Sequence, residues 1–247
     1  MAGPGTNRIE AVLTQSPTLH RYDSREDLAE ALAAGVAAVL AGAIATRGVA
    51  TLAVSGGSTP KRFFERLAET EIDWASVTVT LVDERWVPET SERSNAAMVR
   101  RHLLTGPAAS AHFLPFYIDA PAPEDVAEEL RLRFLRLARP FDVTVLGMGT
   151  DGHTASFFPQ ADNLAAAIDP DTREPVTPIR APGAGEPRIT LTLPLIVDTR
   201  FLALHIEGEE KLAVYEAAMQ PGPVDAMPVR AVLRAPRVEK LAVFWAP

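Results

Sequence analysis

The sequence contains no cysteine, which excludes disulfide bonds and thiolate chemistry from its 247 residues. Aromatic residues make up only 6%, and positive charge is scarcer than negative charge: 24 Lys and Arg residues stand against 32 Asp and Glu residues, a formal net charge of -8. Such an excess of negative charge disfavours binding to nucleic acid through its phosphates. A small anionic ligand is not excluded, because a few local cations can dominate the charge of one pocket.

We expect the sequence to carry no signal for export or membrane insertion. The N-terminal segment MAGPGTNRIE lacks the basic start and apolar run of a secretory signal. We also expect no stretch to approach the roughly 20 apolar residues that cross a bilayer. Together with the absence of cysteine, these features predict a cytoplasmic protein that contacts no membrane.

Apolar runs of strand length alternate with longer segments whose apolar residues recur at helical spacing. This alternation predicts an α/β fold, a single domain over residues 1–247 in which an open, mainly parallel sheet carries helices on both faces. The predicted strands are 49–55, 76–83, 111–118, 141–149, two within 188–206 around a short turn or helical piece, and 241–247. The predicted helices are 23–45, 60–69, 94–104, 124–138 and one that begins near Glu209. We expect residues 159–187, rich in Pro, Asp, Gly and Ala, to have little regular structure.

The segment SGGSTP, residues 55–60, lies between a predicted strand and a predicted helix. We expect Thr59 to cap that helix and Pro60 to occupy its first position, which leaves unpaired backbone N–H groups above the end of the strand. Such an arrangement suits an anion, although an ordinary strand-to-helix turn explains the same residues. The segment is not a Walker loop, because the G-K-[ST] ending is missing.

The segment GMGTDGHTASFFP, residues 147–159, formally contains G-x-G-x-x-G after a strand. Pro159 and a Pro/Asp-rich region follow in place of a helix, which excludes a dinucleotide site. Asp151 and His153 flank one glycine just past a buried strand, where open α/β sheets bind ligands. His153 can serve as a general base, and Asp151 can orient its imidazole. A capping Asp beside a surface His is the plainer alternative.

The segment LVDERWVP places Asp83, Glu84 and Arg85 at the end of another predicted strand. The planar guanidinium of Arg85 suits phosphate or another oxyanion, and a solvated salt-bridge cluster is the alternative. No H-E-x-x-H motif or Cys/His cluster is present, so no metal site is predicted. The remaining histidines have no comparable setting and are interpreted as structural or surface residues: His20, His102, His112 and His205.

In their order and spacing these motifs resemble those of the 6-phosphogluconolactonase family over nearly the full length of the chain. They are SGGSTP, DERWVP followed by SNAAMVRRHLL, FDVTVLGMGTDGHTASFFP, RITLTLPLI, and Lys211 in EGEEKLAVYEA. The resemblance implies a NagB/RpiA-like, Rossmann-type fold and hydrolysis of 6-phospho-D-glucono-1,5-lactone to 6-phospho-D-gluconate in the oxidative pentose phosphate pathway. It implies no cofactor and no metal, and we expect a monomer or a weak homo-oligomer.

The same resemblance assigns roles to individual residues. His153 is expected to be the base that activates water, with Asp151 as its orienting partner. The residues expected to bind the substrate and its phosphate are Ser55, Gly56, Gly57, Ser58, Thr59, Asp83, Arg85, Asn95, Arg188 and Lys211.

Two alternatives remain at the level of sequence. Glucosamine-6-phosphate deaminases share this fold, and their histidine segment resembles D-G-H-I-A-F-N-E-P, with a catalytic glutamate where this chain has Phe158. Their counterpart of DERW resembles D-E-Y, whereas this chain has Arg85, so both differences favour the lactonase over a deaminase or isomerase. A noncatalytic sugar-phosphate sensor would carry a DNA-binding helix-turn-helix, for which we expect the residues before Asp23 to be too few.

Overall fold

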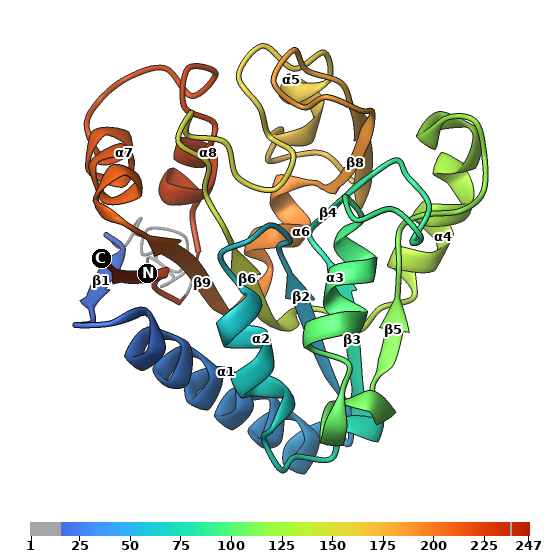
Figure 1. Cartoon of the computed structure of the whole chain (residues 1–247). Helices are drawn as coiled ribbons and strands as arrows, with labels where there is room; N and C mark the ends of the chain where they lie inside the picture. Colours follow the sequence, from blue (N-terminus) through green and yellow to red (C-terminus); the bar gives the residue numbers. More distant parts are fainter. Residues whose placement is uncertain (1–15, 238) are drawn as a thin grey trace, which may run out of the picture.

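The computed structural model describes residues 16–237 and 239–247 of the chain. Seven strands form one open sheet in the order β1-β10-β9-β6-β2-β3-β5, and every neighbouring pair is parallel (Figure 1). The predicted α/β fold with a parallel sheet is therefore confirmed. The strands are β1 (Thr18–Arg21), β2 (Ala50–Val54), β3 (Val77–Leu81), β5 (His112–Leu114), β6 (Phe141–Leu146), β9 (Thr199–Glu207) and β10 (Ala242–Ala246).

The two central strands, β2 and β6, are buried along their whole length. Their sequences, ATLAV and FDVTVL, are near-continuous apolar runs, as strands covered on both faces require. From β2 the chain proceeds outward to β3 and β5, and from β6 it proceeds outward in the other direction to β9 and β10. The strand order thus reverses between β2 and β6, and ligands of open α/β sheets bind beyond the carboxyl ends of the strands at such a point.

Helices cover both faces of this sheet. Right-handed crossovers place α1 (Arg25–Arg47), α2 (Lys61–Ala68) and α3 (Asn95–His102) on one face, in front of the sheet in Figure 1. The same rule places α4 (Ala127–Leu135) and α6 (Leu193–Val197) on the other face. Two helices, α7 (Glu209–Met219) and α8 (Val229–Arg234), connect β9 to β10. Short 3-10 turns occupy Trp74–Ser76, Gly106–Ser110 and Pro123–Val126.

The long helix α1 begins after Ser24, whose side-chain oxygen accepts a hydrogen bond from the backbone N–H of Asp27 at 3.1 Å. An 18-residue window of α1 has a mean hydropathy of 2.0, so the expectation that no segment is long and apolar enough to cross a bilayer is wrong for this helix. The helix nevertheless packs on the sheet through a fully buried stripe at helical spacing: Leu28, Leu32, Val36 and Leu40. Alanines outside the stripe supply much of the hydropathy, and α1 is a core helix of this fold.

A second, antiparallel sheet lies beyond the main one and was not predicted. Its strand order is β4-β8-β7, with β4 at Asp83–Arg85, β8 at Arg188–Leu191 and β7 at Val176–Ile179. The prediction of little regular structure over residues 159–187 is wrong in part, because α5 (Leu164–Ala167) and β7 lie there. The pairing of β4 with β8 sets Arg85 opposite Arg188, so this sheet brings two distant cations together. Neither β1 nor α8 was predicted, and both are short.

Candidate active site

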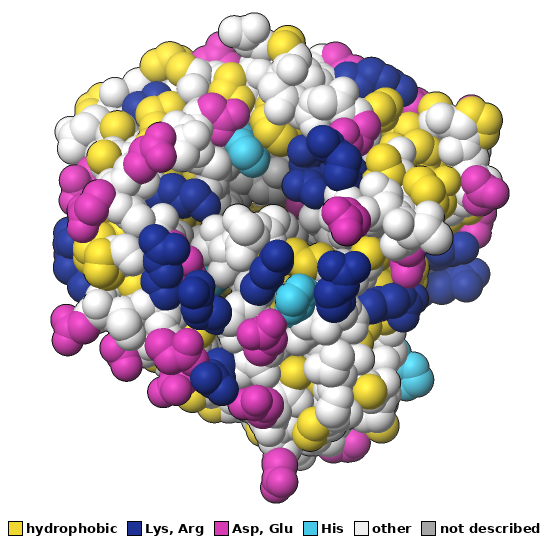
Figure 2. Space-filling view, viewed as in Figure 1, with side chains coloured by type: hydrophobic (Ala, Val, Ile, Leu, Met, Phe, Trp, Pro, Cys, Tyr) yellow, Lys and Arg dark blue, Asp and Glu magenta, His cyan; other side chains and the backbone are white. Residues whose placement is uncertain are grey.

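A cavity of about 210 Å³ lies beyond the carboxyl ends of β2, β3, β6 and β9. In Figure 2 it is a hollow with a His side chain and dark blue Lys and Arg side chains around its mouth. His153 lines the cavity, whereas Asp151 does not. All the predicted binding residues line it as well: Ser55, Gly56, Gly57, Ser58, Thr59, Asp83, Arg85, Asn95, Arg188 and Lys211. The expected convergence of separate strands on one edge of the sheet is thus confirmed.

The loop after β2 leaves its backbone N–H groups without partners. Within the described part of the chain, no hydrogen-bond acceptor is found for the N–H groups of residues 56–59. A Cβ atom at Gly56 would overlap the side-chain amide of Asn95, and Gly57 has a φ of +92°, so both positions require glycine. The helix α2 begins at Lys61 with Pro60 at the cap position, one residue later than predicted. Free N–H groups before a helix form a binding site for an anion.

The hydroxyl of Thr59 does not cap α2, which corrects the prediction for that residue. Its Oγ1 instead accepts a hydrogen bond from Lys211 Nζ at 3.0 Å. Lys211 lies in the first turn of α7, as predicted, and burial lowers the pKa of its amine despite the opposing charge of Glu207. The loop after β2 and a cation of α7 therefore face the same part of the cavity.

His205 also lines the cavity, so its interpretation as a residue outside the site was wrong. The side chain is 2% exposed, and its Nε2 lies 3.2 Å from Glu207 Oε1. Burial lowers the pKa of His205, which favours a neutral ring that donates from Nε2 to Glu207. The sequence signal was the His-x-Glu pair on one face of the strand, after the apolar run FLAL and at the strand end nearest Lys211.

Asp151 holds the imidazole of His153. Its Oδ1 lies 2.5 Å from His153 Nδ1 and accepts the backbone N–H of His153 at 3.1 Å. Burial alone would raise the pKa of Asp151, but the hydrogen bond and charge of His153 hold it below its usual value. An ionised Asp151 only accepts hydrogen bonds, so in the neutral form of His153 the proton is on Nδ1 and the lone pair of Nε2 is free. A Cβ atom at Gly149 would overlap this ring, which explains the glycine.

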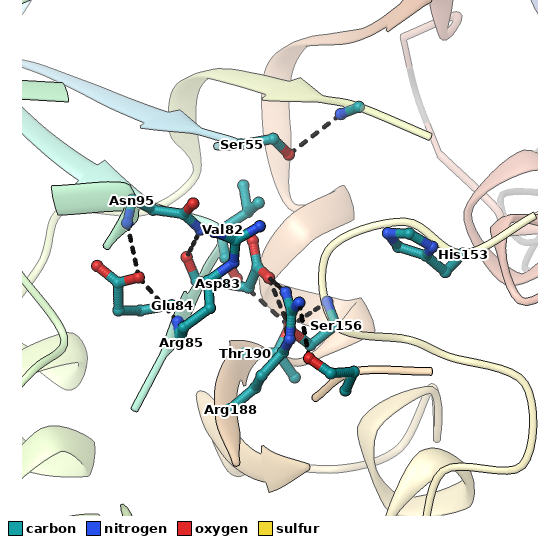
Figure 3. Close-up of polar contacts among 12 residues, drawn as sticks. Ser55, Val82, Asp83, Glu84, Arg85, Asn95, His153, Ser156, Arg188 and Thr190 are labelled. Atoms are coloured by element: carbon teal, nitrogen blue, oxygen red, sulfur yellow. Dashed lines mark hydrogen bonds and ion pairs between the residues drawn. The ribbon is translucent and has the colours of Figure 1, made fainter. Parts of the chain in front are cut away.

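Asp83 and Arg188 form a buried ion pair in the cavity wall (Figure 3). Asp83 Oδ2 accepts hydrogen bonds from Ser156 Oγ at 2.6 Å and from a guanidinium nitrogen of Arg188 at 3.4 Å. Burial lowers the pKa of Arg188, and the charge of Asp83 opposes this shift. Arg188 and Lys211 were both expected among the residues that bind the substrate and its phosphate, and they have different partners in the cavity wall: Asp83 and Ala184 for Arg188, and Thr59 for Lys211.

Glu84 connects β4 to the start of α3 from a fully buried position. Its carboxyl oxygens accept the backbone N–H groups of Arg85, Asn95 and Ala96 at 2.8 Å each, and the hydroxyl of Ser94 at 3.0 Å. Burial nevertheless raises its pKa to about 7, against the effect of these hydrogen bonds. Glu84 therefore fixes two residues of the cavity wall, Arg85 and Asn95, without lining the cavity itself.

Glu84 should make the stability of the protein depend on pH. Between its usual value of 4.5 and about 7, the folded chain keeps a proton on Glu84 that the unfolded chain releases. The contribution of Glu84 to the free energy of unfolding therefore falls as the pH rises, by up to about 3 kcal/mol across this window. Glu84→Gln has no titrating carboxyl group at this position. Urea unfolding should therefore show that the free energy of unfolding of the wild type, relative to that of Glu84→Gln, is smaller at pH 7 than at pH 5. A difference that grows with pH would contradict the raised pKa.

Within residues 16–237 and 239–247, no group of three or more His, Asp or Glu side chains is placed to hold a metal ion. The polar groups of the cavity include the imidazole of His153, the ammonium of Lys211, the guanidinium groups of Arg85 and Arg188, and the free backbone N–H groups of residues 56–59.

Comparisons with known proteins find similarity over most of the chain. The profile of the family described as glucosamine-6-phosphate isomerases/6-phosphogluconolactonase matches residues 23–243. The chain is 52% identical over 227 residues to a 6-phosphogluconolactonase of Mesorhizobium japonicum, with 92% of this chain and 94% of that protein covered. It is 50% identical over 232 residues to a 6-phosphogluconolactonase of Rhizobium meliloti, with 94% and 100% covered.

Solved structures give the same relationship at the level of the fold. A crystal structure of a 6-phosphogluconolactonase from Shewanella baltica superposes with a TM-score of 0.91 at 39% identity, covering 95% of this chain and 99% of that one. A monomeric glucosamine-6-phosphate deaminase superposes with a TM-score of 0.72 at 15% identity, covering 93% and 97%, which is a likeness of fold alone.

Proposed function

Because this chain belongs to the glucosamine-6-phosphate isomerase/6-phosphogluconolactonase family, we propose that its cavity hydrolyses 6-phospho-D-glucono-1,5-lactone by general-base activation of water at His153. The activity is that of a 6-phosphogluconolactonase, a hydrolase of the pentose phosphate pathway. The observation that supports the mechanism is the His153–Asp151 pair at the edge of a cavity that also holds free N–H groups and Lys211.

The phosphate of the substrate binds at the loop after β2. The unpaired N–H groups of residues 56–59 and the ammonium of Lys211 together suit a dianion. Its binding energy fixes the sugar in the cavity and thereby places C1 of the lactone near His153. Within this scheme the phosphate takes no part in the chemical step.

At the other part of the cavity, His153 Nε2 takes a proton from a water molecule as its oxygen attacks C1. The positive charge that forms on the imidazole is stabilised by Asp151, which is held 2.5 Å from Nδ1. The C1 carbonyl oxygen becomes an oxyanion, and we assign its stabilisation to the guanidinium of Arg188. The intermediate then collapses: the bond between C1 and the ring oxygen breaks, and the imidazolium returns its proton to that oxygen. The product acid ionises to 6-phosphogluconate.

His153→Ala should lower kcat by about 100-fold to 10,000-fold, because the variant loses the base but keeps the binding groups. The lactonase rate is measured above the spontaneous hydrolysis of the lactone, on protein whose circular dichroism matches the wild type. His112→Ala, an exposed histidine on β5, is the matched control and should keep full activity. Near-normal hydrolysis by folded His153→Ala would refute the assignment of the base.

Lys211→Ala should lower kcat/KM by about 10-fold to 100-fold for the phosphorylated lactone, the loss expected for one charge-assisted hydrogen bond. Plain glucono-1,5-lactone should be nearly unaffected, because it has no phosphate for Lys211 to bind. Arg188→Ala should instead slow both lactones by similar factors. Lys240→Ala, an exposed lysine before β10, is the matched control. If Lys211→Ala lowered kcat/KM equally for both lactones, Lys211 would not be a ligand of the phosphate.

A further inference from the structure

Phe158 lies between the base and the buried cation of the cavity. Its ring stacks on the imidazole of His153 with centroids 4.2 Å apart and planes 26° from parallel. The guanidinium carbon of Arg188 lies 4.8 Å from the centroid of the same ring. Phe158 is 2% exposed and does not line the cavity, so it can affect the reaction only through His153 and Arg188.

A tight turn folds Phe158 back onto His153. Thr154 Oγ1 donates to the carbonyl of Gly147 at 2.7 Å, and the carbonyl of Thr154 accepts the N–H of Phe157 at 2.9 Å. Ala155, within this turn, has a φ of 49°, a conformation unfavourable for a residue with a side chain. Strained backbone of this kind persists where the surrounding structure holds it, and it clusters at functional sites.

His153 depends on the ring more than Arg188 does. The only side chain that hydrogen-bonds the imidazole within the described chain is Asp151, which holds Nδ1 and leaves the ring free to tilt about that contact. The His153 side chain is 30% exposed. Arg188 is instead held by Asp83 at 3.4 Å and by the carbonyl of Ala184 at 3.2 Å, with 9% of its side chain exposed. Loss of the aromatic ring would therefore release the base first.

We propose that Phe158 is a positioning residue whose flat ring keeps Nε2 of His153 directed into the cavity. The inference rests on the proposed role of His153 as the base. The ring also acts during the reaction, because its face attracts the positive charge that the imidazole gains when it takes the proton from water. A branched aliphatic side chain would fill the space but supply neither the flat surface nor the attraction.

Phe158→Leu tests this role by removing the flat ring. We expect kcat to fall about 10-fold, since small misplacement of a catalytic group costs that much or more. KM for the phosphorylated lactone should stay within about twofold, because the loop after β2 and Lys211 are untouched. Phe158→Tyr, which keeps a flat ring, should recover most of the lost kcat. Proton NMR of the His153 ring supplies an independent signal, since the ring current of Phe158 should disappear in Phe158→Leu and persist in Phe158→Tyr.

Phe157→Leu is the matched control, because Phe157 is fully buried in the same turn but its ring stacks on neither His153 nor Arg188. It should lower Tm while leaving kcat per folded molecule unchanged. A kcat for Phe158→Leu equal to that of wild type, with His153→Ala inactive, would overturn this inference and leave the proposed function intact. Equal losses of kcat in Phe158→Leu and Phe157→Leu would also overturn it, as would an unrescued Phe158→Tyr with a native His153 spectrum.

Discussion

The parallel pairing of β2 with β6 is the constraint from which the active site follows. It continues one residue beyond β2, where the N–H of Ser55 donates to the carbonyl of Val145 at 2.9 Å. The N–H of Gly147, just after β6, then donates to Ser55 Oγ at 3.1 Å, although the two residues are 92 positions apart. The loop after β2 and the segment that contains His153 therefore start side by side at the point where the strand order reverses.

The small antiparallel sheet completes the cavity from the other side. Its β4–β8 pairing places Arg85 opposite Arg188, and Asp83 offsets part of that positive charge through its ion pair with Arg188. Glu84 fastens the same strand to α3 and so fixes Asn95, whose amide occupies the space that a side chain at residue 56 would need. A chain with a net charge of -8 thus has three cations in the lining of one cavity, Arg85, Arg188 and Lys211, where the proposed mechanism places a dianionic substrate.

The sequence predicts this fold and site well where one local pattern decides the outcome. Apolar runs identified β2 and β6, and the positions of Asp151 and His153 after a buried strand identified the pair that the structure joins. Patterns failed where tertiary contacts decide. Thr59 was expected to cap a helix but accepts a hydrogen bond from Lys211, and His205 was interpreted as a structural or surface residue but lines the cavity. Strand β4 is only three residues long and pairs with β8, a strand far along the chain, so no local pattern announces it. The alanine-rich sequence of α1 likewise does not show that its apolar stripe packs against the sheet.

The orientation of the substrate is the central claim of this account, and a crystal structure of the protein with 6-phosphogluconate tests it most directly. Phosphate oxygens should lie within hydrogen-bond distance of the N–H groups of residues 56–59 and of Lys211 Nζ. The C1 carboxylate should lie beside His153 Nε2, with one oxygen on the guanidinium of Arg188. A phosphate bound at Arg188 and His153, with the carboxylate at the loop after β2, would contradict it.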